Sequence, residues 1–339
     1  MNEKNTFFLQ YGQDYDIISE KDFAEKMRAD VVPFLNSRRK SRVFTREADQ
    51  ALYCETFLTP ADVPKGTIMI SHGFTESCDK YHEVIYYMLR EGYHVLIFEH
   101  RGHGRSRTPN ETNVANTPTH VEHFQDYVND MSYVVMEVLK KEMPEPYYLF
   151  AHSMGGAIGA AFAEARPDIF YKIIFTAPMF EINRHGIPKI LAKFIGFWNC
   201  LTGKSRDFTV MQKPFSIEPD FDASPCTSEA RYMYYFNQQL AHPEYQSAGS
   251  SNRWARECLR ACDQLLQPVN CRRIRIPVLL FQADDDSFVY PGGQNRFMSQ
   301  IPDGKSVFVP GSRHEIYMSG DAITARYWRI IFDFLDGKI

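Results

Sequence analysis

The chain has 339 residues, of which 44% are hydrophobic and 14% aromatic, and its formal net charge is −4. This length and apolar content suit one large domain with an insertion, or two smaller domains. The small negative charge gives no support to nucleic-acid binding, which needs a basic stripe or a basic domain. The composition therefore favours a globular protein with a substantial core and no nucleic-acid partner.

Neither a signal peptide nor a membrane-spanning segment is expected. Residues 1–18 mix charged and amide side chains with aromatic ones, and no later apolar run is long enough to cross a bilayer. The seven cysteines are scattered without a Cys-x-x-Cys pair, a pattern that predicts neither a disulfide framework nor a zinc ribbon. We therefore expect reduced thiols in a cytoplasmic protein, with no metal and no other cofactor.

Apolar strands alternate with helical segments through the first half of the chain. An N-terminal extension, residues 1–42, has helical spacing over residues 20–35 and ends in a short basic run that is expected to be a solvated face. Strands are expected at residues 52–58, 67–70, 95–98, 147–150 and 172–176, with helices at residues 80–91, 121–141 and 154–165. This alternation predicts an α/β fold in which helices flank a mostly parallel sheet on both faces.

The alternation stops after residue 178 and resumes near residue 269. Residues 179–268 contain many aromatic side chains among helix-compatible stretches, whereas strands are expected again at 277–281 and 306–309 and helices at 294–300 and 322–335. We therefore predict an α/β core made of residues 1–178 and 269–339, with residues 179–268 inserted as a mainly helical cap.

A serine lies at the turn between one expected strand and the next helix. The sequence Ala151-His152-Ser153-Met154-Gly155-Gly156 reads Ala-x-Ser-x-Gly, close to the Gly-x-Ser-x-Gly nucleophile elbow that such a strand-turn-helix context supports. A serine there is held off the sheet, and the helix N-terminus beside it offers free N–H groups to a developing anion. Ser153 is therefore the candidate nucleophile, although serine is also a common helix cap.

An activated serine needs a histidine base, and the elbow topology places first an acid and then the histidine later in the chain. Of the histidines after Ser153, two, His185 and His242, lie in the predicted cap. His314 follows an expected core strand, in a loop that leads into the last helix. The order of the motifs thus predicts His314 as the base.

The acid is expected after the strand at residues 277–281, where three aspartates stand in a row. Asp286 precedes a polar residue and two apolar ones, which is the usual arrangement, so we choose Asp286. Asp285 stays open as an alternative and Asp284 is less favoured, since aspartates are common turn residues.

Two backbone N–H groups are expected to hold the oxyanion of the tetrahedral intermediate. One belongs to Met154, directly after the serine, and the other to Phe74 in the loop His72-Gly73-Phe74 after the first buried strand. His72 is interpreted as a residue that orders this loop. The glycine-rich stretch at residues 101–106 lacks both the P-loop and the Rossmann spacing, so it is interpreted as a supporting turn.

These motifs together resemble the α/β-hydrolase superfamily, in particular its bacterial lysophospholipase and monoacylglycerol lipase branch. The resemblance covers nearly the whole chain and is carried by residues 71–77, 99–106, 151–156, 177–182, 281–286 and 311–315. It implies a serine hydrolase with a helical cap that acts on acyl esters. Glu99 stands where many relatives have Asp, and Ala151 where many have Gly.

The aromatic cap suits an apolar acyl chain, because ligand sites are mostly apolar with few polar anchors. Four aromatic residues of the cap, Phe180, Phe194, Phe197 and Trp198, are candidate substrate contacts. Residues 187–206 also carry four basic side chains and no acid among apolar ones, which is typical of a helix at a membrane surface. A cap helix with its lysines in water is the alternative.

The expected substrate is a small acyl ester, a lysophospholipid or monoacylglycerol cleaved through an acyl-enzyme on Ser153. An aminopeptidase of the same fold is one alternative, for which Glu218, Asp220 and Asp222 could hold a substrate amine. A ligand-binding protein with this fold and little turnover is another.

Overall fold

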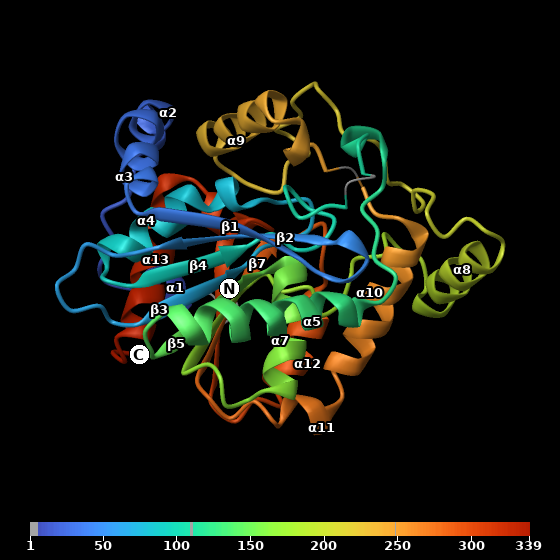
Figure 1. Cartoon of the computed structure of the whole chain (residues 1–339). Coiled ribbons are helices and arrows are strands. Elements are labelled where there is room, and N and C mark those ends of the chain that lie inside the picture. Colours follow the sequence, from blue (N-terminus) through green and yellow to red (C-terminus); the bar gives the residue numbers. More distant parts are fainter. Residues whose placement is uncertain (1–5, 109–110, 248) are drawn as a thin grey trace.

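A central eight-stranded sheet organises the computed structural model, which describes residues 6–108, 111–247 and 249–339 (Figure 1). The strand order is β1-β2-β4-β3-β5-β6-β7-β8. All neighbours from β4 to β8 are parallel, whereas β2 is antiparallel to both β1 and β4. This arrangement confirms the predicted fold class. The strands are β1 Arg39–Thr45, β2 Ala51–Phe57, β3 Thr67–Ser71, β4 His94–Phe98, β5 Tyr147–His152, β6 Lys172–Thr176, β7 Val278–Asp285 and β8 Gly304–Arg313.

Helices cover both faces of the sheet because successive strand residues point to opposite sides. On β3, Met69 joins one buried cluster whereas Ile68 and Ile70 join the other. The helices on the Met69 side are α5 Phe124–Val134, α7 Ser153–Ala165, α10 Asn252–Leu265 and α12 Pro291–Met298, and those on the other side are α1 Thr6–Gln10, α4 His82–Arg90 and α13 Asp321–Leu335.

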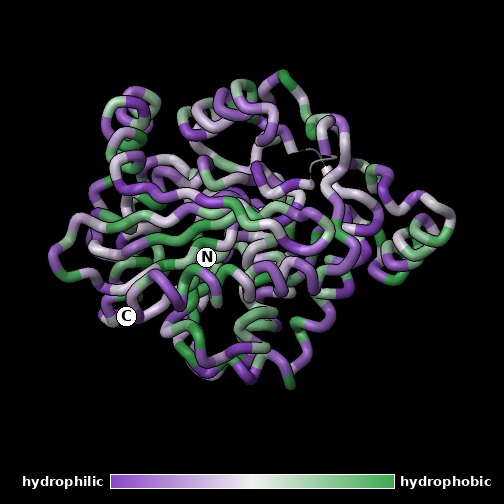
Figure 2. The backbone as a smooth tube through the Cα atoms, viewed as in Figure 1, coloured by the Kyte–Doolittle hydropathy of each residue, from purple (hydrophilic) through white to green (hydrophobic). Residues whose placement is uncertain are grey.

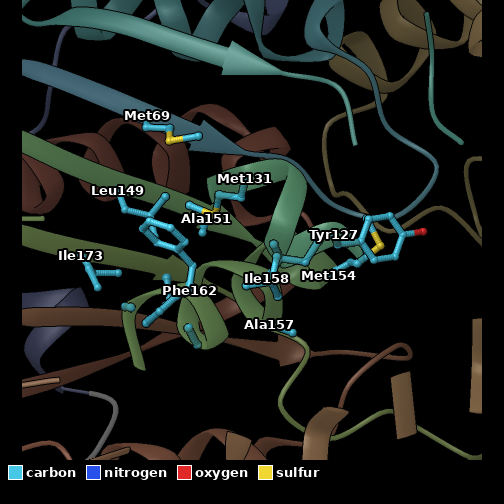
Figure 3. Close-up of a cluster of buried hydrophobic side chains, with 14 of the residues drawn as sticks. Met69, Tyr127, Met131, Leu149, Ala151, Met154, Ala157, Ile158, Phe162 and Ile173 are labelled. Carbon is cyan, nitrogen blue, oxygen red and sulfur yellow. The ribbon is translucent and has the colours of Figure 1, made fainter. Parts of the chain in front are cut away.

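Figure 3 shows the core on the Met69 side, where sheet and helix side chains interlock. Leu149 and Ile173 of the sheet lie in one buried cluster with Met131 of α5 and with Ile158 and Phe162 of α7. This packing fixes α7, and therefore its N-terminal residue, against the carboxyl end of the sheet.

The N-terminal extension is helical over the predicted stretch, but its basic run belongs to the sheet. Residues 39–42 lie in β1, an edge strand on which Arg42 pairs with Glu142 and Arg39 with Glu55 (3.2 Å). Charged side chains suit an edge strand, since they discourage pairing with other chains. The helical segments before β1 are η2 Glu20–Asp22, α2 Phe23–Lys26, η3 Met27–Val31 and α3 Val32–Asn36.

The inserted segment is mainly helical, as its composition predicted. It contains α8 Lys189–Leu201, α9 Glu229–Ala241, η8 Pro243–Tyr245 and α10, and α11 Pro268–Cys271 begins at its end. Helix α10 buries Trp254, Cys258 and Cys262 in the same cluster as α5 and α7, whereas α8 lies at the periphery of the molecule (Figure 1). The boundaries at residues 178 and 268 stay predictions.

The remaining short segments complete the chain. They are η4 Glu47–Asp49, η5 Cys78–Tyr81, η6 Val114–Asn116, η7 Val135–Leu139, α6 Lys140–Glu142 and η9 Ile316–Met318. All seven cysteines are free thiols. Across the described ranges, no helix combines the length and hydropathy that a bilayer crossing needs. Figure 2 shows hydrophobic segments along the central strands and also on the peripheral helix α8.

Candidate active site

The turn between β5 and α7 holds Ser153 in a left-handed backbone conformation, with φ +50°. A non-glycine residue is rare in this region, and such strain is often found at functional sites. The turn also needs Gly155, because a Cβ atom there would lie 2.1 Å from the carbonyl oxygen of Ser71 on the neighbouring strand β3. The small residues of the motif thus let α7 start directly above the sheet.

Three side chains from three strand ends form one hydrogen-bonded chain. The Oγ of Ser153 lies 2.8 Å from Nε2 of His314, and Nδ1 of His314 lies 2.7 Å from Oδ2 of Asp286. Since an ionised carboxylate only accepts, Nδ1 carries the hydrogen and Nε2 is free to accept from the serine hydroxyl. The geometry is that of a serine, a base and an orienting acid.

Asp286 is the only one of the three neighbouring aspartates that the structure places against His314. Its other oxygen accepts the backbone N–H groups of Phe288 (2.9 Å) and Val289 (3.0 Å). Burial alone would raise the pKa of Asp286, but the nearby His314 and these hydrogen bonds hold it below its usual value. Asp284 instead accepts the N–H of Gly311 (2.9 Å), and Asp285 is exposed.

The loop after β3 brings Phe74 to the cavity that contains Ser153. His72 orders this loop: its Nδ1 donates to the carbonyl of Gly73 (2.8 Å) and its Nε2 accepts the N–H of His100 (2.9 Å). This agrees with its interpretation as a loop-ordering residue. The ring of Phe74 lies against the ring of Trp254 on α10, with centroids 4.2 Å apart.

A buried carboxylate, Glu76, lies beneath the same loop and was not singled out from the sequence. It accepts the N–H of Gly73 (2.5 Å), the hydroxyls of Tyr81 (2.6 Å) and Tyr317 (2.8 Å), and the ammonium of Lys80 (3.1 Å). Burial alone would raise the pKa of Glu76, but Lys80 and the other donors lower it. Glu76 is therefore an ionised anchor for the loop that carries Phe74.

The same cluster reaches the loop that carries His314 and the turn that carries Ser153. Lys80 also pairs with Glu315, the residue after His314. His152, the residue before Ser153, lies with Nε2 3.6 Å from Glu76 and with its ring centroid 4.9 Å from that of His314. Burial lowers the pKa of His152 to about 3, so this ring is neutral near pH 7.

Two groups of acidic and histidine side chains are close enough to be considered as metal sites in the described part of the chain. One is Glu76, His152 and Glu315, and the other is Glu55, Asp79 and His82. In the first group, the ammonium of Lys80 already contacts both carboxylates and supplies the positive charge that a metal ion would bring.

The cavity beside Ser153 has a volume of about 360 Å³ and mostly apolar walls. Core loops and cap helices both contribute to the walls, which include Phe74, Met179, Ile182, Ile195, Trp254 and Phe288. This combination of a polar reaction centre and an apolar enclosure suits a hydrocarbon chain next to the serine.

None of the four predicted cap contacts is among the residues that line this cavity. Phe180 packs in the core, with its ring centroid 4.3 Å from that of Phe297. Phe194, Phe197 and Trp198 are 59%, 48% and 53% exposed, because α8 turns Ala192, Ile195 and Gly196 toward the cavity instead. The aromatic content of the cap therefore did not identify the cavity wall.

The acidic cap residues considered for binding an amine also lie elsewhere. Glu218, Asp220 and Asp222 are exposed and do not line the cavity. Among the described residues, its walls contain no aspartate and no glutamate. The cavity thus lacks a counter-charge for a substrate ammonium group.

Comparisons with known proteins identify the family of this chain. A family model described as serine aminopeptidase S33 matches residues 62–321. Lysophospholipase L2 of Escherichia coli is 29% identical over 279 residues, 79% of this chain and 80% of that protein. Monoglyceride lipase of Rattus norvegicus is 34% identical over 197 residues, 56% of this chain and 61% of that protein.

The fold is also that of solved lipases. The crystal structure of a soluble variant of monoglyceride lipase from Saccharomyces cerevisiae, in complex with a substrate analogue, aligns with a TM-score of 0.67 at 18% identity, over 89% of this chain and 97% of that chain. The chain belongs to the S33 serine aminopeptidase family of α/β-hydrolases. The family and the named relatives together indicate a carboxylic ester hydrolase, which confirms the predicted enzyme class.

Proposed function

We propose that this chain cleaves the carboxylic ester of a single-acyl-chain lipid, a lysophospholipid or a monoacylglycerol, through an acyl-enzyme on Ser153. The observation that carries the proposal is the 2.8 Å contact between Ser153 Oγ and His314 Nε2 at the wall of an apolar cavity. The names of the relatives, lysophospholipase and monoglyceride lipase, support the substrate class.

In the proposed mechanism, His314 removes the proton of Ser153 as the serine oxygen attacks the ester carbonyl. Asp286 holds the ring orientation and stabilises the imidazolium that forms. The N–H groups of Phe74 and Met154 are assigned to the oxyanion. His314 then protonates the leaving glyceryl oxygen, and water, activated by the same histidine, releases the fatty acid and restores Ser153.

An aminopeptidase has less support, because binding an α-ammonium group requires a carboxylate that the described cavity wall does not offer. A binding protein without turnover has no specific observation in its favour. The hydrogen-bonded order of serine, histidine and aspartate favours turnover instead.

We also propose peripheral membrane contact through the outer face of α8, which presents exposed apolar side chains: Ile190 84%, Leu191 48%, Phe194 59%, Phe197 48%, Trp198 53% and Leu201 66%. Lys189 and Lys193 both pair with Asp263, and Arg206 pairs with Glu122 (2.9 Å). These ion pairs weaken the attraction of the basic side chains to anionic lipids. Burial of the apolar side chains is therefore expected to contribute most of the membrane-binding free energy. A cytoplasmic location, inferred from the cysteines, remains part of this proposal.

A substrate panel tests the proposed function. Purified protein is assayed against lysophospholipids, monoacylglycerols, short p-nitrophenyl esters and aminoacyl anilides. We expect the highest kcat/KM on the single-chain lipid esters. On the aminoacyl anilides we expect no hydrolysis that is lost when Ser153 is replaced. Preferential cleavage of the anilides would replace the proposal with an aminopeptidase.

A further inference from the structure

The cavity beside Ser153 carries positively charged side chains without negative ones. Arg184 and Arg256 line it, and the described wall includes neither Asp nor Glu. Charges that line an apolar cavity are costly unless they have a partner, either in the protein or in the ligand. The two arginines differ in this respect.

The charge of Arg184 is compensated within the protein. Its guanidinium lies 3.4 Å from Glu181, donates to the carbonyl of Ile182 (3.0 Å) and lies over the ring of Tyr290, 5.2 Å from the centroid. Its two Nη groups are directed toward Glu181 and the carbonyl of Ile182. Arg184 is therefore a poor candidate for binding a ligand anion.

Arg256 has no such compensation. In the described portions of the chain, its guanidinium meets no carboxylate and donates no hydrogen bond; it lies over the ring of Phe197, 5.6 Å from the centroid. A guanidinium presents five N–H donors in a planar fork that matches a phosphate or a carboxylate. Half-buried at the cavity wall, Arg256 keeps this fork free.

The position of Arg256 relates it to the reaction centre. Helix α10 contributes Trp254, Ala255, Arg256 and Leu259 to the same cavity as Ser153. Trp254 contacts Phe74, the residue assigned to the oxyanion site. Trp254 and Arg256 both line the cavity that contains Ser153, so a ligand in this cavity can meet the reaction centre and Arg256 at the same time.

We propose that Arg256 binds the phosphate of a single-chain substrate and so selects a lysophospholipid over a neutral monoacylglycerol. This inference rests on the proposed function. In a lysophospholipid only the glycerol backbone separates the acyl carbonyl from the phosphate, so a carbonyl held at Ser153 keeps the phosphate near the cavity. The charge pair supplies binding that a monoacylglycerol cannot obtain.

The test compares two water-soluble substrates with one acyl chain, octanoyl lysophosphatidylglycerol and monooctanoylglycerol, both kept below the concentration at which they form micelles. For Arg256→Gln, we expect the ratio of the two kcat/KM values to shift against the phosphate substrate by about tenfold to a hundredfold. Arg256→Lys keeps the charge but not the fork, so its shift is expected to be smaller.

Arg260→Gln is the matched control, since Arg260 lies on the same helix, pairs with Glu257 (3.4 Å) and is absent from the cavity wall. It is expected to leave the ratio as in the wild type. A binding measurement is independent of turnover: titration of Ser153→Ala with octanoyl lysophosphatidylglycerol should lose about the same factor in affinity when Arg256→Gln is added.

The possible results separate the two proposals. If the wild type cleaves neither substrate, the proposed function fails and the role of Arg256 fails with it. If the wild type cleaves both substrates, and Arg256→Gln either changes the two kcat/KM values by the same factor or leaves both unchanged, only the role of Arg256 is overturned. If Arg256→Gln lowers activity only on substrate presented in anionic vesicles and leaves the hydrolysis of monomeric substrates unchanged, Arg256 acts at the membrane surface. That result would also overturn its role in binding the substrate phosphate.

Discussion

The imidazole of His314 accepts from the hydroxyl of Ser153 at 2.8 Å, although 161 residues separate the two in the chain. Parallel strands explain this meeting, because β5, β7 and β8 all end at the same edge of the sheet and each is followed by one member of the hydrogen-bonded set.

Removing either partner of this contact should abolish turnover. We expect Ser153→Ala and His314→Ala each to lower kcat by up to about 10⁶ on the preferred ester, because nucleophile and base act as one unit. Steady-state hydrolysis and thermal unfolding are measured in parallel, and the melting temperature should stay near that of the wild type. Near-normal activity in Ser153→Ala would refute the mechanism.

Asp286 and Asp285 are neighbours with different expected roles. Asp286→Asn should lower kcat by about 10³ to 10⁴, because an amide no longer fixes the ring tautomer that lets Nε2 accept. Asp285→Asn is the matched control and should cost less than about threefold, since its side chain is exposed. The opposite ranking would move the acid to Asp285.

The sheet and the three hydrogen-bonded residues could be predicted from the sequence because their signals are local. Strands β2 to β8 each contain a short apolar run, and Ser153, Asp286 and His314 each follow the end of such a strand, whereas the charged edge strand β1 was not predicted. The known chain order of the motifs then supplied the long-range information.

The cap and the buried charges could not be predicted in the same way. Whether Phe180 or Phe194 lines the cavity depends on which face of its segment meets the core, and aromatic content does not carry that information. The pair of Lys80 and Glu315 joins residues 235 positions apart. One signal was available, since Lys80 stands four residues after Glu76, a spacing at which opposite charges meet on a helical turn.

Glu76 should act as a positioning residue for the oxyanion loop. Glu76→Leu removes the acceptor of the Gly73 N–H, so we expect kcat on the ester to fall about tenfold to a hundredfold with a smaller change in KM, because misplaced donors affect mainly the transition state. The variant should also be less stable, since Lys80 loses one of its two carboxylates.

The double variant Glu76→Leu with Lys80→Met separates the two effects. Removing both charges should recover part of the melting temperature lost in Glu76→Leu, while kcat stays low. If kcat recovers together with stability, Glu76 serves folding only and has no role in positioning the loop.

The outer face of α8 should bind lipid surfaces. Replacing both Phe194 and Trp198 by Ser removes two exposed aromatic rings, so the fraction of protein that co-sediments with phosphatidylcholine vesicles should fall several-fold. Hydrolysis of monomeric substrate should persist, because neither ring lines the cavity. Val63→Ser, at an 84% exposed position between β2 and β3, is the control and should bind as the wild type does. Equal vesicle binding by the wild type, the double variant and Val63→Ser would exclude this face of α8 as the membrane-binding surface.

Glu164 on α7 should make the stability depend on pH. Its side chain is buried, and in the described structure its Oε1 has no hydrogen-bond partner. Burial raises its pKa to about 8 from a usual value of 4.5, although Arg273 opposes this. The native protein therefore holds a proton that the unfolded chain releases between these pH values, so stability falls as pH rises through this window.

Glu164→Gln mimics the protonated side chain and should remove this dependence. At about pH 4, where both states are protonated, the variant and the wild type should unfold at similar denaturant concentrations. At about pH 9 the variant should be more stable by an amount of the order of a few kcal/mol. Asp168→Asn, which removes a carboxylate that is 67% exposed, is the control and should show no such divergence. A constant difference between Glu164→Gln and the wild type across pH would mean that Glu164 is ionised in the native protein, since only a neutral buried carboxyl couples folding to proton uptake in this range.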